Sequence, residues 1–389
     1  MIQRYFIAST TVLNKLRDKF ALLHRIASKD INWLPIKTEA QLIFADERST
    51  PLIAPLIPSY VRYLSVPVRG DTAFLNLKIF YHLIFSLPLL VQKKCSLQGI
   101  YLLAISRAIR GRVIISTIDN NSWGNLCDFS ELRVLSIQNG LRNSRDYDPP
   151  MSKQDIYVGL SRTKPAALRA NRYVGIGSLF CALAGIEARD LQPDNQKSIV
   201  YVSQFRAASW NSAVNKVELK LARWTHRYAI ENDHHFYLAP DSIRNPHLRE
   251  KEIVHYRSVG LELDVPSEAD RFTNIQKVAS ARLVVGHSST LLIEALAMGV
   301  PTLCGINVDK IINQKNLEVE AFDAIDGQFM LPQRVTYEDF RSLADAACDL
   351  SLDELNLKVS RIRERCCEFV GSEKYLQSLS RVISRTLLD

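Results

Sequence analysis

The sequence predicts an α/β protein of two Rossmann-like, doubly wound domains that face each other across a cleft. The chain has 389 residues, which is long for a single domain. Short apolar strands alternate with helices in both halves, as they do in doubly wound folds. The alternation stops at a polar stretch, 189–198, and then restarts. We therefore expect one domain over 1–180, a linker over 181–198, a second domain over 199–350 and a helical segment over 351–389.

The first half contains short apolar runs that predict six strands, at 41–44, 60–66, 113–118, 133–137, 155–160 and 172–176. An apolar stretch over 76–91 predicts a helix that is broken or kinked at Pro88, because proline lacks a backbone N–H and its ring crowds the preceding turn. A second helix is expected at 97–109, and a helical period runs over 12–28.

The second half repeats this alternation. Strands are expected at 199–203 and 235–238, with a short one at 261–263. Helices are expected at 213–231 and 270–279. From Tyr337 onward the chain is charged and helical, including 352–371 and 374–388.

The segment 281–307 reads as one complete βαβ unit. Its strands are expected at 282–285 and 302–306, and a Gly-His-Ser-Ser turn leads into a helix at 290–298. Gly299 suits the left-handed position after a helix, and Pro301 prevents the helix from continuing.

Glu294 is unusual because the rest of its predicted helix is apolar almost all round. A capping box does not explain it, since Leu291 lies three residues earlier. Thr290 shares its helix face, and a helix start with free N–H groups and hydroxyls suits a phosphate. A carboxylate one turn further on suits the hydroxyls of a ribose. The alternative is that Ser288 and Ser289 only cap the helix and that Glu294 meets an arginine.

Polar side chains follow the ends of four other predicted strands, the edge at which parallel sheets bind ligands. They are Asp119 and Asn120; Gln138, Asn139, Gly140 and Arg142; Ser203 and Gln204; and Asp241 and Arg244. Each has an ordinary alternative, since Asn-Gly forms turns and aspartates cap helices or form Asx turns. His287 lies beside the predicted phosphate site, where it could touch donor or substrate. The histidines show no metal-ligand spacing.

The net charge of +8 and the pI near 9.1 permit an anionic partner, such as a nucleotide-activated substrate or an anionic membrane surface. The basic residues form no dense run, which argues against nucleic acid. Seven cysteines without a CxxC pair favour a reducing compartment. No signal peptide is evident, and the most apolar window, 79–91, is too short to span a bilayer. We expect a cytoplasmic protein, with the inner face of the inner membrane as an alternative location.

With these residues in place, a resemblance can be named. SARLVVGHSSTLLIEALAMGVPTL is similar to the donor-nucleotide segment of GT-B glycosyltransferases. The order VIISTIDNNSW, VLSIQNGLR, DIYVGLS and YVGIGS resembles bacterial surface-carbohydrate biosynthesis proteins, which include retaining β-Kdo transferases that use CMP-Kdo. The resemblance covers roughly residues 110 to 310.

The resemblance implies that Ser288, Ser289 and Thr290 hold the donor phosphate and Glu294 the ribose, and that Asp119, Gln138, Asn139 and Arg142 line the sugar or acceptor side. Together with the other residues at the strand ends, these assignments give the following predicted roles. Donor binding would fall to Ser203, Gln204, Arg244, His287, Ser288, Ser289, Thr290 and Glu294. The sugar or acceptor side would be lined by Asn120, Gln138, Asn139, Gly140 and Arg142, in the first domain. For a retaining reaction Asp241 is the first choice of nucleophile and Asp119 the second. No metal and no cofactor are expected.

The sequence therefore predicts a glycosyltransferase that moves a sugar, with Kdo from CMP-Kdo favoured, to a glycan or lipid-linked glycan of a bacterial surface polysaccharide. Two alternatives stay open. A nucleotide-sugar 2-epimerase has a similar architecture, and a non-catalytic glycan-binding partner of an assembly complex could keep the same fold.

Overall fold

The computed structural model of the chain describes 14 segments of the sequence. They are residues 30–47, 49–68, 72–91, 96–117, 126–129, 131–142, 154–187, 198–205, 213–240, 246–261, 263, 271–308, 322 and 324–388. The helical period expected over 12–28 and most of the expected linker lie outside these segments.

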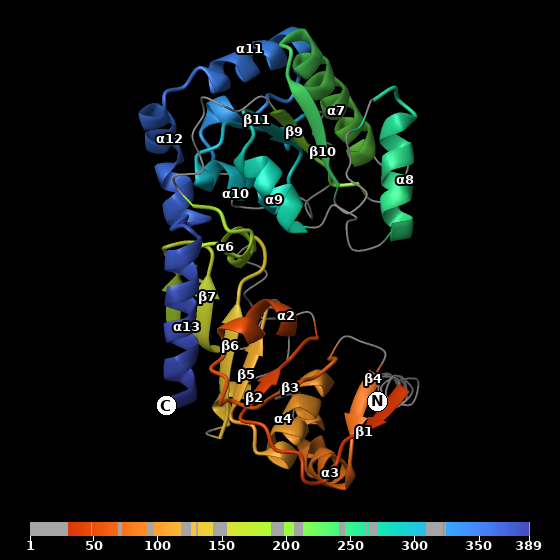
Figure 1. Cartoon of the computed structure of the whole chain (residues 1–389), viewed down its shortest axis with the longest axis vertical. Coiled ribbons are helices and arrows are strands. Elements are labelled where there is room, and N and C mark those ends of the chain that lie inside the picture. Colours follow the sequence, from red (N-terminus) through yellow and green to blue (C-terminus); the bar gives the residue numbers. More distant parts are fainter. Residues whose placement is uncertain are drawn as a thin grey trace, which may run out of the picture.

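The N-terminal half is built on a six-stranded parallel sheet with the strand order β3-β2-β5-β6-β7-β8 (Figure 1). The strands are β2 (Leu42–Phe44), β3 (Tyr63–Ser65), β5 (Val113–Ser116), β6 (Arg133–Ile137), β7 (Gln154–Gly159) and β8 (Ala170–Gly175). Strands β2, β5 and β7 are buried along their whole length, as expected when helices cover both faces of a parallel sheet.

Two separate apolar cores lie on the two faces of this sheet. On one face, Ile43 and Ile114 pack with α4 (Leu97–Ile109) and with the inner side of α3 (Leu77–Val91). On the other face, Phe44 and Ile115 pack with α13 (Ser372–Leu388) and α6 (Leu179–Leu183). Neighbouring residues of one strand face opposite cores because side chains alternate along a strand. Short helices α2 (Thr50–Ile53) and η1 (Ala54–Leu56) and a two-stranded sheet, β1 (Asp30–Trp33) with β4 (Thr72–Leu75), complete this half.

The C-terminal half is built on a four-stranded parallel sheet with the order β10-β9-β11-β12. The strands are β9 (Ser198–Val202), β10 (His235–Ala239), β11 (Leu283–Gly286) and β12 (Thr302–Cys304). One face packs against α9 (Arg271–Ala279), α10 (Thr290–Met298) and α12 (Leu352–Arg365), and the other against α7 (Ala213–Glu231) and α11 (Tyr337–Cys348). Helix α8 (Pro246–Arg257) lies at the β10 side of this half (Figure 1).

The chain passes between the two halves twice. The first pass leads from the end of β8 into α6, and the second leads from α12 through residues 366–371 into α13. Helix α13 thus returns to the first sheet, where Tyr375, Leu379 and Ile383 join its core (Figure 1). Where the passes meet, Gly177 has a φ of +97°, and a Cβ there would lie 2.2 Å from the backbone oxygen of Glu368. Only glycine fits this crossing without strain.

These observations confirm the expected fold class: two Rossmann-like, doubly wound parallel sheets with C-terminal helices. Three helices match their expected bounds: α4, α7 and α10. Gly299 ends α10 with a φ of +89°, as predicted.

Other expectations were wrong in detail. Helix α3 is not broken at Pro88 but continues to Val91, because Pro88 lies within the last turn and interrupts little of the helix, whereas the alternative of a kink there stays a prediction. No strand forms at Leu261 or Leu263, and Leu261 instead packs into the core beside α7. The helix expected over 352–371 ends at Arg365, since the chain there begins its pass to the first sheet.

Candidate functional site

The candidate site lies where the strand order of the second sheet reverses, between β9 and β11. Strand β10 lies on one side of β9 and β11 on the other. Open parallel sheets bind ligands at such a switch point, outside the carboxyl ends of the strands. Gln204 follows β9 and Ser288 follows β11, and the Ser288 hydroxyl donates to Gln204 Oε1 at 2.6 Å. The structure therefore brings together two predicted donor-binding residues from distant parts of the sequence.

Helix α10 begins at this point with polar groups and ends among apolar ones. Ser289 is its N-cap, and Ser289 Oγ accepts a hydrogen bond from the Leu291 N–H at 3.3 Å. Among the described residues, none accepts a hydrogen bond from the backbone N–H of Ser289 or of Thr290. The start of a helix also carries the positive end of its dipole. This end of α10 can therefore bind a phosphate or another anion.

His287 lies directly beside this helix start and is buried. Its Nδ1 is 2.9 Å from Ser288 Oγ. Ser288 has a single hydroxyl hydrogen and donates it to Gln204, so a His287 tautomer with its proton on Nδ1 fits this contact.

Gln204 is held in turn by a buried carboxylate, Glu218 of α7. The Gln204 N–H donates to Glu218 Oε2 at 3.0 Å. The hydroxyls of Tyr201 and Tyr256 donate to the same oxygen at 2.8 and 3.3 Å. Tyr256 Oη is also 3.0 Å from Ser203 Oγ, so its single hydroxyl hydrogen is shared between Glu218 and Ser203, and Ser203 Oγ donates to Glu252 Oε1. The end of β9 is therefore fixed by a buried network rather than by exposed loop contacts.

Glu218 and Glu252 are not among the residues that sequence reasoning selected. Glu218 occupies a core position of the helical period of α7, between Val217 and Leu221, so it carries the same signal as Glu294. Burial raises the pKa of Glu218 to about 7, with the charge of Glu252 adding to the rise and the hydrogen bonds it accepts opposing it. Burial also raises the pKa values of Tyr201 and Tyr256, so both remain hydroxyl donors at neutral pH.

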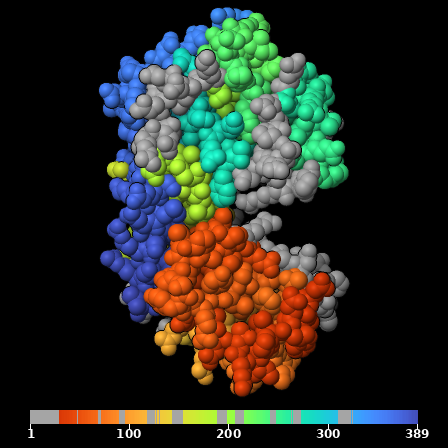
Figure 2. All heavy atoms as spheres, viewed as in Figure 1, coloured from red at the N-terminus to blue at the C-terminus, as the bar shows by residue number. Residues whose placement is uncertain are grey.

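The loop after β6 meets the start of α10 from the other half of the molecule. The Leu141 N–H lies 3.4 Å from Thr290 Oγ1, and a Cβ on Gly140 would lie 3.6 Å from that oxygen. Predicted sugar-side and donor-side residues are thus neighbours across the two halves. Figure 2 shows a hollow between the orange and red N-terminal half and the green C-terminal half.

The amides of this loop serve largely to shape it. Gln138 Nε2 donates to the Gly140 carbonyl, and Gln138 Oε1 accepts from the Leu160 N–H, each at 2.9 Å. Arg142 donates to Asn139 Oδ1 at 2.7 Å. These contacts agree with the turn interpretation of Asn-Gly. Contact with a sugar or acceptor by the same residues stays a prediction.

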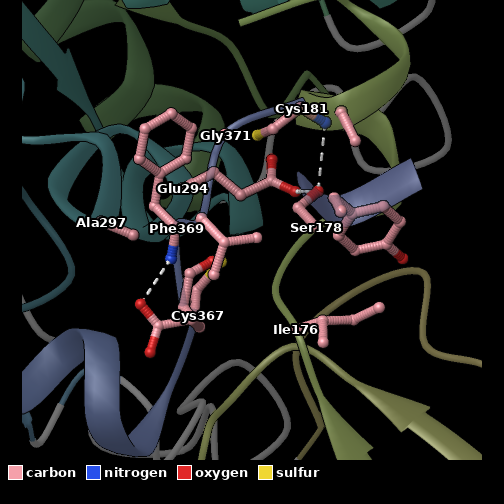
Figure 3. A pocket seen from close by; sticks show the side chains of 12 residues that line it. Ile176, Ser178, Cys181, Glu294, Ala297, Cys367, Phe369 and Gly371 are labelled. Carbon is pink, nitrogen blue, oxygen red and sulfur yellow. Dashed lines mark hydrogen bonds between the residues drawn. The ribbon is translucent and has the colours of Figure 1, made fainter. Parts of the chain in front are cut away.

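Glu294 is buried in a pocket between the two halves, where its Oε1 accepts a hydrogen bond from Ser178 Oγ at 2.5 Å (Figure 3). Ser178 is also the N-cap of α6, on the first pass between the halves. Cys181, Cys367 and Phe369 line the same pocket. One partner of Glu294 is therefore the hydroxyl of Ser178, and a contact with an arginine stays a prediction. Its contact with a ribose stays a prediction.

Four of the predicted site residues lie outside the described residues: Asp119, Asn120, Asp241 and Arg244. The position of Pro240, immediately before Asp241, is known, because its carbonyl accepts from Asn274 Nδ2 at 3.2 Å.

The first sheet has its own switch point between β2 and β5, which sequence reasoning did not select. Ser49 follows β2 and Thr117 follows β5, and their hydroxyl oxygens are 2.8 Å apart. Buried Asp46 lies between the end of β2 and Ser49 in the sequence. Polar residues directly after a strand were the available signal, as they were for the residues after β6.

The part of the chain that the structure describes holds no group of three or more His, Cys, Asp or Glu side chains placed to bind a metal ion. None of its helices combines the length and the apolar character needed to cross a bilayer. Cys181, Cys304, Cys348, Cys366 and Cys367 are free thiols.

No protein-family model matches the chain, and no curated protein matches it. Solved structures do match. A variant of the wall teichoic acid polymerase TagF is 11% identical, with a TM-score of 0.52 over 91% of this chain and 90% of that one. Another TagF variant, soaked with CDPG, is 11% identical, with a TM-score of 0.52 over 97% and 95%. These likenesses and the two parallel sheets show a GT-B fold.

A putative UDP-N-acetylglucosamine 2-epimerase from Listeria monocytogenes is 13% identical, with a TM-score of 0.46 over 89% of this chain and 96% of that one. A likeness that weak favours no activity.

The buried carboxylate beneath Gln204 leads to a testable dependence of stability on pH. The folded chain holds a proton on Glu218 more tightly than the unfolded chain, whose pKa is near 4.5. The stabilising contribution of this group is therefore complete below pH 4.5 and is lost as the pH rises toward 7. Glu218→Gln, which cannot ionise, is expected to gain about 2 kcal/mol relative to the wild type between pH 5 and pH 8.

Urea unfolding at both pH values measures this difference, with Glu250→Gln, an exposed glutamate of α8, as the matched control. The control should follow the wild type. An equal response of the two variants to pH would contradict the raised pKa of Glu218.

Proposed function

We propose that the chain is a nucleotide-sugar-dependent glycosyltransferase that builds a bacterial surface glycan. The observation that carries the proposal is the start of α10, placed at a switch point and held between Gln204 and the loop after β6. A GT-B fold shared with TagF supports it, because the printed name of that protein is that of a wall teichoic acid polymerase. Fold likeness alone does not specify a reaction, so the residues of the site must supply the chemistry.

The donor phosphate would bind at the start of α10. The backbone N–H groups of Ser289 and Thr290 are suited to bind an anion, and the hydroxyls of Ser288 and Thr290 lie beside them. His287 Nε2 could donate to the same phosphate when the imidazole is protonated. Ser203 shapes this wall through its bonds to Tyr256 and Glu252. Arg244 would add a positive charge, and Glu294 would reach the ribose.

The nucleotide proposed is a cytidine nucleotide, with CMP-Kdo as the favoured donor. Two observations support this choice. The segments between 110 and 310 resemble CMP-Kdo-using transferases, and the TagF variant of similar fold was soaked with CDPG, a CDP-glycerol donor. The acceptor would be a glycan or a lipid-linked glycan that enters beside Asn139 and Arg142.

The proposed reaction is retaining and proceeds in two displacements. A carboxylate, Asp241 or else Asp119, attacks the anomeric carbon, and the bond from that carbon to the phosphate oxygen breaks, releasing CMP. An acceptor hydroxyl then attacks the same carbon, gives up its proton to a base, and restores the free carboxylate. Groups at the start of α10 would stabilise the negative charge that develops on the departing phosphate.

The donor site can be tested by the thermal stabilisation that CMP, CDP, UDP, GDP and ADP give to the protein. CMP or CDP at 100 times its Kd should add about 2.7 kcal/mol to the free energy of unfolding. Thr290→Val and Ser288→Ala should lose most of this gain, because each removes a hydroxyl beside the phosphate. Ser360→Ala, an exposed serine of α12, is the matched control and should keep the full gain.

The outcomes separate the alternatives. Stabilisation by UDP or GDP alone would retain the transferase and remove the cytidine donor. Stabilisation by none of the five nucleotides would contradict the proposed site. Glu294→Gln tests the ribose contact, which is absent if its affinity for the nucleotide is unchanged.

The nucleophile can be tested by turnover of CMP-Kdo with a glycan acceptor. Asp241→Asn is expected to reduce turnover by about 1,000-fold or more while nucleotide binding is kept, because the carboxylate acts only in the chemical step. Asp119→Asn is the second variant, and full activity in both would remove the two-displacement mechanism. Release of an epimerised sugar nucleotide from donor alone would instead indicate a 2-epimerase, and binding without turnover a glycan-binding partner.

A further inference from the structure

Helix α3 is apolar on both of its sides. Its inner side packs on α4 through Ile79 and Leu83. Its outer face carries five large apolar side chains at helical spacings of three and four, each 48% to 69% exposed: Leu77, Phe80, Tyr81, Ile84 and Phe85. We call these five residues the outer face of α3. Surface helices are normally polar on the outside, so a contiguous apolar face of this kind indicates a binding partner.

The apolar surface extends beyond the helix. Strand β4 leads directly into α3, and its last residue, Leu75, pairs with Trp33 of β1. Trp33 is 69% exposed, and its partner Leu75 lies two residues before Leu77, the first residue of α3. Helix α3 and strand β1 both lie in the end of the molecule farthest from α11 (Figure 1), and each carries exposed aromatic residues. These aromatic residues are the ones that concentrate at the interface between water and lipid.

The positive charge of the protein lies in the same part of the chain. The first 112 residues contain 16 Lys and Arg and 6 Asp and Glu, whereas the other 277 contain 33 and 35. The net charge of +8 therefore comes entirely from the segment that carries α3. Lys78 and Arg107 are near the helix itself. The pKa of His82 is lowered by burial and, in addition, by these two cations.

We propose that the outer face of α3 docks in the interfacial layer of an anionic lipid bilayer. Helix α3 has 15 residues and a length of about 22 Å, which is short of the roughly 30 Å needed to span the hydrocarbon layer. It would lie in the plane of the interface, with its apolar side chains among the acyl chains and Lys78 of the helix near the lipid phosphates. This proposal goes beyond the proposed reaction and does not depend on it.

A second copy of the chain fits this surface less well. A symmetric pairing through α3 would bring two strongly basic segments face to face, and like charges oppose such a contact. Residues 1–29 are themselves basic, with six Lys and Arg and one Asp. Their charge is therefore opposite to that of an anionic lipid surface and the same as that of the segment that carries α3.

The test is co-sedimentation of the full chain with vesicles. Vesicles of equal parts phosphatidylglycerol and phosphatidylcholine should bind the wild type, pure phosphatidylcholine should bind it far less, and added salt should weaken binding. The double variant Phe80→Ser/Phe85→Ser should lose about tenfold or more in partitioning, because two phenyl rings no longer enter the lipid. The double variant Ile230→Ser/Leu357→Ser, 65% and 76% exposed in the other half, is the matched control.

Urea unfolding measured without vesicles checks that both variants are folded and keeps this test separate from the proposed reaction. Equal partitioning of the wild type and the α3 variant would overturn the proposal. So would failure of the wild type to bind anionic vesicles, as expected if residues 1–29 cover α3. A wild-type dimer that becomes a monomer in the α3 variant would replace the bilayer with a second copy.

Discussion

The hydrogen bond from Ser288 to Gln204 is the contact on which the candidate site depends. It joins the ends of the two strands that flank the switch point, and it orients the hydroxyl next to the start of α10. Gln204 cannot move freely, because its backbone N–H donates to Glu218, a buried residue of α7. The pKa of Glu218, raised to about 7, places a change of charge directly beneath this contact near neutral pH. Site geometry and ionisation are therefore coupled.

Helix α10 connects this site to the junction between the two halves. Its first turn carries Thr290, which meets the loop after β6, and its second turn carries Glu294, which accepts from Ser178 on the first pass of the chain. Its far end is held by Arg363, which donates to the Ala297 carbonyl at 2.7 Å. A ligand at the start of α10 therefore lies on an element that both halves contact.

Local signals predicted α10 and much of both sheets. The start of α10 is marked by a Ser-Ser-Thr turn, its length by an apolar run and its end by Gly299. These signals lie close together in the sequence, and the observed bounds of the helix follow them. Contacts between distant residues could not be predicted in this way. The parallel pairing of β1 with β4 depends on residues about 40 positions apart, and the highly charged sequence of α8 shows little of the apolar periodicity that marks a helix. The same holds for the site. Its hydroxyl residues could be selected from the sequence, whereas the role of Glu218 depends on where α7 packs.

The most direct test of the account is a crystal structure of the protein with CMP bound. We expect the phosphate to lie within hydrogen-bonding distance, about 3 Å, of the N–H groups of Ser289 and Thr290, with Ser288 still bound to Gln204. A phosphate bound at the ends of β2 and β5, beside Ser49 and Thr117, would contradict the assignment of the donor to the second half. A CMP bound in contact with neither switch point would contradict the account as a whole.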